Sequence, residues 1–232
     1  MVANQDFKPQ QSNSEMLISY NLLRKTIGCL AFFLPIVLGI GGIFYAGCDF
    51  IENSISDYYH TEMRNILVGT LCAVAMFMFA YRGPDKYHTY AGNIACFSAV
   101  CVAFFPTSVD DVSSCSTDCI AYAGWIGITH LIAALIFFGV LIYFSLKLFP
   151  AKNDKTEHAS HQSHLRDRIY LISGYVMIAC VALIILYFLI DEKYPGLEKY
   201  KPVFILELIA LWAFGISWLT KGQFFFKDKK QH

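Results

Sequence analysis

Apolar residues gather in six long runs along this chain, and short polar segments separate the runs. A helix needs roughly 20 residues to cross a bilayer core about 30 Å thick, because its backbone polar groups must be satisfied within the segment. The pattern therefore predicts an all-α fold, a polytopic bundle of six transmembrane helices. The predicted spans are residues 27–47, 65–81, 90–105, 121–149, 170–190 and 202–220.

The runs together define one membrane domain at residues 27–220, between an N-terminal segment at 1–26 and a tail at 221–232. The second and third runs are the shortest, so they must extend into polar flanks or cross a thinned bilayer. Segment 1–26 is polar and contains no cleavable signal, so we expect the first span to be an uncleaved anchor. Residues 150–168 are polar and predict a long inner loop.

Lysine and arginine are distributed unevenly between the two sides of the predicted bundle. With the N-terminus inside, only Arg64, Lys193, Lys199 and Lys201 of the 18 basic residues fall on outer segments. Cytoplasmic loops carry the excess of lysine and arginine in membrane proteins. The distribution therefore predicts that the N-terminus and the C-terminus are both cytoplasmic.

Composition supports the membrane assignment and narrows the partners. With 56% hydrophobic residues the chain is too apolar for an ordinary soluble domain. Its formal net charge of zero lacks the basic excess that nucleic acid requires, so we expect membrane lipids and no nucleic acid as partners. The sequence does not specify whether the protein forms a homo-oligomer.

Two ionisable residues lie inside predicted spans, His130 in the fourth and Glu207 in the sixth. A charged group at the centre of a span costs roughly 2.5–3.5 kcal/mol on insertion scales, so such residues usually face a partner or a cavity. Both lie in the outer half of their spans, where the first outer loop adds hydroxyl, carboxylate and imidazole groups. The predicted outward-facing polar pocket consists of Ser56, Asp57, Tyr59, His60, His130 and Glu207.

Several functions are compatible with this pocket. Zinc accepts imidazole and carboxylate ligands, which makes His60, His130 and Glu207 candidate ligands, with zinc as the only candidate cofactor. The same groups suit a general acid–base pair or the headgroup of a lipid. The alternative is structural, with His130 and Glu207 bonding each other or a backbone carbonyl. No spacing here forms a specific metal or nucleophile motif, so no catalytic residue is assigned.

Two further pairs of residues carry hypotheses. Arg82 and Asn93, on the inner side, could contact lipid phosphates, which the fork geometry of arginine suits; charge anchoring explains them equally well. Cys115 and Cys119 stand four residues apart in the second outer loop. In an oxidising compartment this spacing allows a small disulfide, although spacing alone does not guarantee the geometry.

Several segments carry a resemblance to known membrane proteins: SISDYYHTEMRNILVG, AYRG, AGN, AVCVAFFPTS, THLIAALIFF, RDRIYLISG and FILELIALWAFGISWLTKG. Over residues 54–222 the chain resembles an uncharacterised family of bacterial six-helix membrane proteins. More distantly, the loop ISD, the early glycine of the second span and the histidine of a later span are similar to the superfamily of damage-regulated autophagy modulators and GPI-anchor remodelling membrane proteins. The resemblance implies a multi-pass protein of the bacterial inner membrane with polar residues at its outer face and a lipid-related role.

The sequence thus leaves two functional hypotheses. The leading one is a membrane protein that binds or senses a lipid or small amphiphile in the outward-facing pocket. The alternative is a membrane-embedded, metal-dependent lipid hydrolase, which requires His60 and His130 to converge on one metal ion. A transporter is disfavoured because the six helices show neither internal repeats nor paired broken helices.

Overall fold

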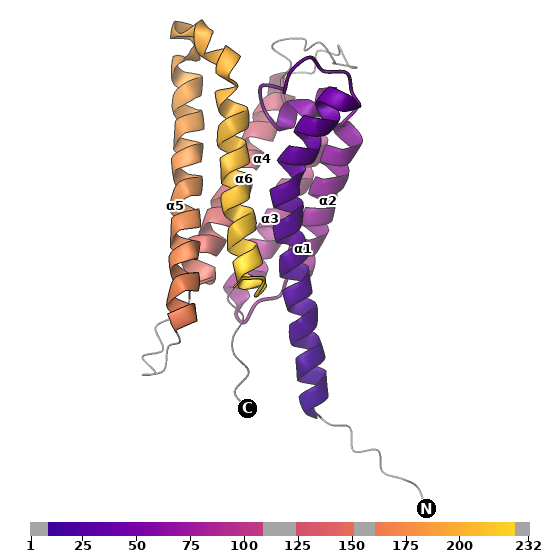
Figure 1. The fold of residues 1–232 in the computed structure, drawn as a ribbon, viewed down its shortest axis with the longest axis vertical. Coiled ribbons are helices and arrows are strands. Elements are labelled where there is room, and N and C mark those ends of the chain that lie inside the picture. Colours follow the sequence, from indigo (N-terminus) through magenta and orange to yellow (C-terminus); the bar gives the residue numbers. More distant parts are fainter. Residues whose placement is uncertain (1–8, 109–123, 151–160, 226–232) are drawn as a thin grey trace, which may run out of the picture.

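The computed structural model describes residues 9–108, 124–150 and 161–225, and six α-helices dominate these ranges (Figure 1). The helices lie side by side. Helix α1 begins and helix α6 ends at the same end of the bundle. Helix α6 packs between α1 and α5, while α3 packs between α2 and α4. The α-helices are α1 (Pro9–Phe44), α2 (Arg64–Ala80), α3 (Lys86–Phe104), α4 (Gly124–Tyr143), α5 (His161–Ile190) and α6 (Pro202–Lys221).

Short helical turns complete the connections in the described part of the chain. A 3-10 helix, Ser56–His60, lies between α1 and α2, and the π-helix Phe144–Leu148 continues α4. Two further 3-10 turns, Asp191–Lys193 and Pro195–Tyr200, join α5 to α6. The described residues contain no strand, so the predicted all-α class is confirmed for them.

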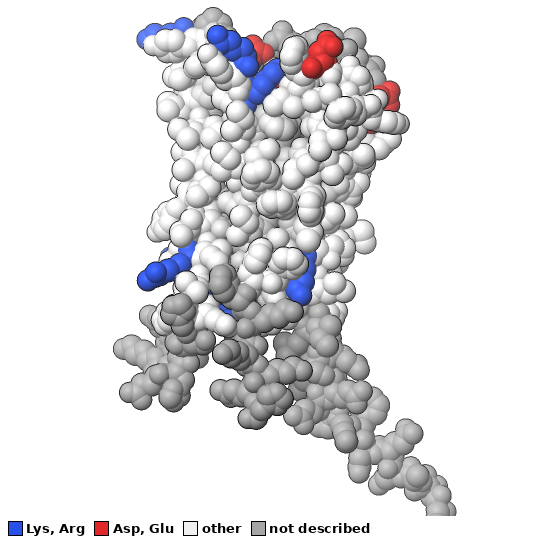
Figure 2. Space-filling view, in the orientation of Figure 1, with Lys and Arg blue, Asp and Glu red and all other residues white. Residues whose placement is uncertain are grey.

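The helices have the length and composition of a multi-pass membrane protein. Four segments are long and apolar enough to cross a bilayer: Ser19–Phe44, Gly124–Leu148, Gln162–Ile190 and Pro202–Lys221. Helix α2 is apolar but shorter, in line with the weak signal of the second run. On the face shown in Figure 2, charged side chains gather near the two ends and leave an uncharged band between them.

Two helices extend further than the hydrophobic pattern predicted. Helix α1 already begins at Pro9, and proline is well tolerated at the first position of a helix. The predicted inner loop at residues 150–168 is wrong over its second part, because α5 begins at His161. Polar residues do not end a helix by themselves, and no glycine or proline interrupts residues 161–170. The helix therefore continues beyond the apolar run.

Bare backbone contacts bring α1 and α6 together near the end of the bundle at which α6 ends, which is called the inner end below. The opposite end, which carries the connection between α1 and α2, is called the outer end. A Cβ atom built on Gly28 would stand 2.8 Å from the Leu219 Cγ and 2.9 Å from the Gly215 carbonyl oxygen. A Cβ built on Gly215 would in turn stand 2.9 Å from the Gly28 carbonyl oxygen. Small residues at such crossings allow membrane helices to approach closely, so packing in this region depends on the two glycines.

An aromatic cluster fills the bundle beside this crossing. The Trp218 ring lies at its centre, with centroid distances of 5.1 Å to Phe149, 5.2 Å to Tyr81 and 5.4 Å to Phe144. The π-helix places Phe144 in this cluster and Ser145 beside Ser217, whose hydroxyl oxygens are 2.9 Å apart. All these side chains are buried, so the inner end of the bundle has a densely packed core.

We expect Gly28→Ala to lower the thermal stability of the protein in detergent micelles. The added methyl group would meet backbone atoms of α6, and overpacking of this kind costs about 1–3 kcal/mol, or roughly 2–12 °C in Tm. The matched control is Gly139→Ala in α4, whose added Cβ meets nothing within 4 Å. Since alanine favours helix more than glycine, the control should keep or raise the Tm. Equal Tm values for both variants would contradict the proposed role of the crossing.

Candidate functional site

The segment between α1 and α2 is fixed to the outer end of the bundle by Tyr58. This side chain is completely buried, and its ring lies 6.3 Å from the ring of Phe204 on α6. A Cβ built on Gly42 of α1 would stand 2.7 Å from the Tyr58 ring, so the glycine makes room for it. The Tyr58 hydroxyl also accepts a hydrogen bond from the Glu52 backbone amide at 3.4 Å. The 3-10 helix Ser56–His60 is thereby held against the helices.

Glu207, on the second turn of α6, is hydrogen-bonded to the segment between α1 and α2. One of its carboxylate oxygens accepts hydrogen bonds from the Ser54 hydroxyl at 2.9 Å and from the Ile55 backbone amide at 2.7 Å. The Ser54 hydroxyl oxygen also accepts from the Ser56 amide at 3.0 Å. The carboxylate therefore satisfies backbone and side-chain donors at the start of the 3-10 helix.

His130 of α4 joins the segment to the end of α3. Its Nδ1 lies 2.7 Å from the Phe105 carbonyl oxygen, and its Nε2 lies 3.1 Å from the Ser56 hydroxyl oxygen. Because a carbonyl oxygen can only accept, Nδ1 must carry the proton, and Nε2 of the neutral ring then accepts from the Ser56 hydroxyl. This geometry fixes the tautomer and the orientation of the ring.

His60 and Asp57 meet through a residue that sequence reasoning missed, Thr107. The His60 Nε2 lies 3.1 Å from the Thr107 carbonyl oxygen, and the Thr107 hydroxyl donates to the Asp57 carboxylate at 3.0 Å. Helix α3 ends at Phe104, and Pro106 and Thr107 follow shortly after it. The proline could have indicated this residue, because a helix usually ends before a proline. The next polar residue, Thr107, then lies at the outer end of the bundle.

Burial determines the protonation of His60, whose side chain is only 5% exposed. Desolvation lowers the pKa of this imidazole below its ordinary value of 6.5, and the nearby charge of Arg64 acts in the same direction. The hydrogen bond to Thr107 opposes the shift without cancelling it. His60 is therefore neutral in the folded protein at pH 7.

Tyr59 lies at the edge of this cluster. Its ring packs edge-on against the His60 ring at 5.5 Å, and the Arg64 guanidinium lies 4.6 Å from the Tyr59 ring centroid. The Arg64 Nε also donates to the Tyr59 carbonyl oxygen at 2.6 Å. Arg64 thus stands beside the polar cluster at the first residue of α2.

The structure brings the predicted pocket residues into one network, with different pairings from those expected. Ser56 contacts His130 directly, Asp57 contacts His60 through Thr107, and Glu207 reaches the network through Ser54. Of the structural alternatives, the bond from His130 to a backbone carbonyl is present. In the described ranges, no three His, Cys, Asp or Glu side chains form a group that could hold a metal ion. The zinc hypothesis for His60, His130 and Glu207 gains no support from this arrangement.

The remaining predicted residues have separate surroundings. Arg82 donates to the Asn93 side-chain oxygen at 3.2 Å, and both side chains are exposed at the inner end. Cys48 is disulfide-bonded, while the other five described cysteines are free. Cys115 and Cys119 lie outside the described residues, and their predicted bridge stays a prediction.

The fold and the polar network define a multi-pass helical membrane protein whose outer connection is tied to three helices by hydrogen bonds. Residues 26–221 match the family model described as "Protein of unknown function (DUF998)", so the chain belongs to the DUF998 family. The match includes all six apolar runs and every residue of the network. No curated protein and no solved structure matches the chain.

We expect His60 to make folding stability depend on pH. Its folded pKa is depressed, so on acidification the unfolded chain binds a proton near pH 6.5 while the folded protein does not. Stability is therefore full above about pH 6.5 and falls as the pH decreases toward the folded pKa. Between pH 7 and pH 5, the Tm of the wild type in micelles should decrease more steeply than that of His60→Gln.

The matched control for this comparison is His164→Gln, because His164 is exposed on α5. The control should keep the pH dependence of the wild type, since all other titrating groups are shared. If His60→Gln and the wild type lose stability in parallel on acidification, the burial argument for His60 is wrong.

Proposed function

We propose that this DUF998 protein binds a membrane lipid without catalysing a reaction, with an acyl chain held between α1 and α2. The observation that carries the proposal is an apolar groove of about 170 Å³ between these helices. Its walls include Phe33, Leu34 and Val37 of α1 and Ile66 and Thr70 of α2.

The position of the groove favours an acyl chain as its occupant. Phe33 is 55% exposed, Val37 43% and Ile66 42%, so the groove opens on the outer surface of the bundle. Phe33 and Val37 lie within a segment long and apolar enough to span a bilayer, where hydrocarbon tails are the surrounding solvent. Apolar walls with one hydroxyl fit such a chain better than a polar ligand.

One end of the groove, at Ile66, lies close to the outer polar cluster. Ile66 follows Arg64 by two residues in the first turn of α2, and Arg64 stands over Tyr59. A lipid with its chain in the groove would place its headgroup at the level of this arginine, whose planar guanidinium suits phosphate. In this proposal, the outward-facing polar pocket predicted from the sequence lies beside Arg64 and forms the surface that contacts the lipid headgroup. The distant resemblance to GPI-anchor remodelling proteins agrees with a lipid-related role.

Filling the groove should reduce the lipid that the protein retains. Thr70→Phe adds an aromatic ring to the groove wall, and we expect at least about a tenfold loss of retained lipid, equivalent to roughly 1.4 kcal/mol. Native mass spectrometry of the protein released from micelles measures the retained lipid directly. The matched control is Met76→Phe on the same helix, a 73% exposed position outside the groove, which should retain the wild-type amount. Equal retention by Thr70→Phe and the wild type would exclude the groove as the site.

The proposal includes an orientation, with both ends in the cytoplasm of a bacterial inner membrane. The positive-inside distribution of lysine and arginine supports it. The disulfide of Cys48, beyond the outer end of α1, agrees with an oxidising compartment on that side.

Reporter fusions should confirm this orientation in a bacterial host. Alkaline phosphatase inserted at Gly196, between α5 and α6, should be active because it folds only outside the cytoplasm. The same enzyme fused after residue 232 should be inactive there, whereas a fluorescent protein at that position should fluoresce. The reverse pattern would invert the proposed orientation.

A second candidate function is lipid hydrolysis, and one contact favours a version of it. The Ser56 hydroxyl donates to the His130 Nε2, and the Phe105 carbonyl orients the other ring nitrogen. This is the arrangement of a nucleophile, a general base and an orienting group, which needs no metal. The metal-dependent version would instead require His130 as a zinc ligand.

Two measurements separate hydrolysis from simple binding. Under the binding proposal, a fluorophosphonate probe leaves Ser56 unlabelled, because the hydroxyl is part of a structural network. The purified protein then also contains no stoichiometric zinc by elemental analysis. Labelling of Ser56 that is lost in His130→Ala would establish the serine version. About one zinc per chain that is lost in His130→Ala would establish the metal version.

A further inference from the structure

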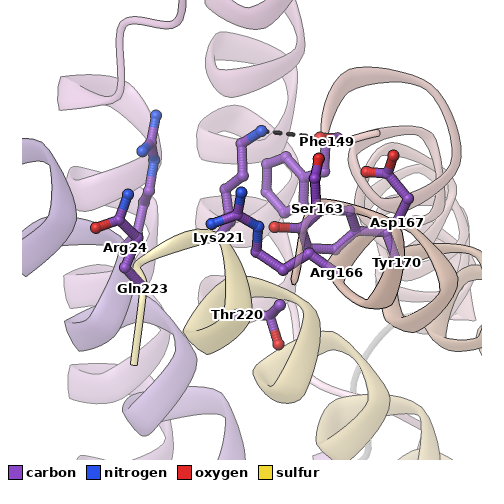
Figure 3. A pocket seen from close by; sticks show the side chains of 9 residues that line it. All are labelled: Arg24, Phe149, Ser163, Arg166, Asp167, Tyr170, Thr220, Lys221 and Gln223. Atoms are coloured by element: carbon purple, nitrogen blue, oxygen red, sulfur yellow. Dashed lines mark hydrogen bonds between the residues drawn. The ribbon is translucent and has the colours of Figure 1, made fainter. Parts of the chain in front are cut away.

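A second cavity, of about 220 Å³, lies near the inner end of the bundle, between α1, the start of α5 and the end of α6 (Figure 3). Three cationic side chains line it: Arg24 of α1, Arg166 of α5 and Lys221 of α6. Asp167 is the only carboxylate among the described lining residues. Among its described lining residues, the cavity therefore has an excess of positive charge, which comes from three helices.

Helix packing places these cations together. The Gly28–Gly215 crossing brings α1 against α6, and Gly222 extends that contact to the inner end of α6. A Cβ built on Gly222 would stand 2.9 Å from the Lys25 Cγ and 3.1 Å from the Asn21 carbonyl oxygen. Arg24, within α1, and Lys221, at the end of α6, consequently lie on neighbouring helices, as Figure 3 shows.

Lys221 is held over the aromatic wall of the cavity by neutral groups. Its ammonium donates to the Phe149 carbonyl oxygen at 2.8 Å. It also lies 5.5 Å from the Phe149 ring centroid and 5.6 Å from that of Tyr170. A carbonyl and two ring faces are thus the contacts that hold the ammonium in place, and none of these groups carries a negative charge.

Arg24 has a similar environment. Its guanidinium donates to the Asn21 side-chain oxygen at 3.3 Å and to the Tyr81 hydroxyl at 3.5 Å, and it lies 5.5 Å from the Tyr81 ring centroid. The Arg24 Nε is buried and has no hydrogen-bond partner in the described part of the chain. Two cations of the cavity thus have neutral partners, which is costly for partly buried charge unless an anion joins them.

We propose that this cavity is an anion site that binds a phosphate group at the inner face of the membrane. The planar guanidinium of arginine can donate two parallel hydrogen bonds to phosphate oxygens, and the ammonium of lysine adds a compact positive charge. Basic pockets between membrane helices at the cytoplasmic side are known to bind lipid headgroups. The hydroxyls of Ser163 and Tyr170 line the same cavity as further hydrogen-bonding groups. Three cations against one carboxylate favour a phosphate monoester, which carries about −1.5 to −2 charges at pH 7.

The phosphate could belong to an anionic lipid of the inner leaflet or to a soluble molecule. The proposal is independent of the acyl-chain groove, because the two cavities share no lining residue. The test measures the Tm of the full chain in micelles, because a ligand that binds the folded state raises it with concentration. One series adds inorganic phosphate against chloride at equal ionic strength. A second adds phosphatidic acid, phosphatidylglycerol or phosphatidylcholine to the micelles.

We expect phosphatidic acid to raise the Tm more than phosphatidylglycerol, and phosphatidylcholine to have no specific effect. Saturation by inorganic phosphate with an equal Tm rise would assign the site to soluble phosphates, whereas a response to the lipids alone would assign it to a headgroup. If neither inorganic phosphate nor either anionic lipid raises the Tm of the wild type, the proposal is overturned without any variant.

Three variants locate the effect. Arg166→Gln should weaken binding by at least about tenfold, because it removes one charge-assisted contact. Asp167→Asn should strengthen binding, because it removes the opposing carboxylate. The matched control Lys86→Gln removes an exposed inner-face cation outside the cavity and should bind like the wild type. Equal weakening in Arg166→Gln and Lys86→Gln would show general attraction to a basic surface and would overturn the proposed site.

Discussion

The close crossing of α1 and α6 is the contact on which the inner half of the molecule depends. At Gly28 and Gly215 the two backbones touch without intervening side chains. In a bilayer, where hydrophobic burial gives little advantage to one helix pairing over another, such close van der Waals contact is a main source of specific association. The crossing brings Trp218 and its ring neighbours into one buried cluster, and it sets Lys221 beside Arg24.

The outer end of the bundle obeys a different constraint, which is the cost of unsatisfied polar groups near hydrocarbon. His130 and Glu207 meet this cost by bonding to the connection between α1 and α2 and to the end of α3. Through these bonds, the polar connection between α1 and α2 packs as part of the bundle. The same bonds orient the Ser56 hydroxyl toward His130. The residues of the structural network therefore also have the arrangement of a nucleophile and a general base.

The two ends therefore differ in how their charges are compensated. At the outer end, Glu207, His60 and His130 each have a hydroxyl or backbone partner within hydrogen-bonding distance. At the inner end, Arg24 and Lys221 are held by carbonyl, amide, hydroxyl and aromatic groups, none of which carries a negative charge. This difference explains why a phosphate site is proposed at the inner end, whereas an acyl chain is proposed for the apolar groove between α1 and α2.

The sequence by itself determined the helices, because a bilayer requires long apolar runs whose backbone groups are satisfied locally. It also placed His130 and Glu207 near the same end of the bundle as the connection between the first two helices, since depth follows from position within a span. Only the tertiary structure decided their partners. Ser54 and Glu207 are 153 residues apart, and Thr107 and the inner cavity were not predicted at all. Such pairings depend on how helices cross and rotate against each other, which hydrophobic periodicity does not encode.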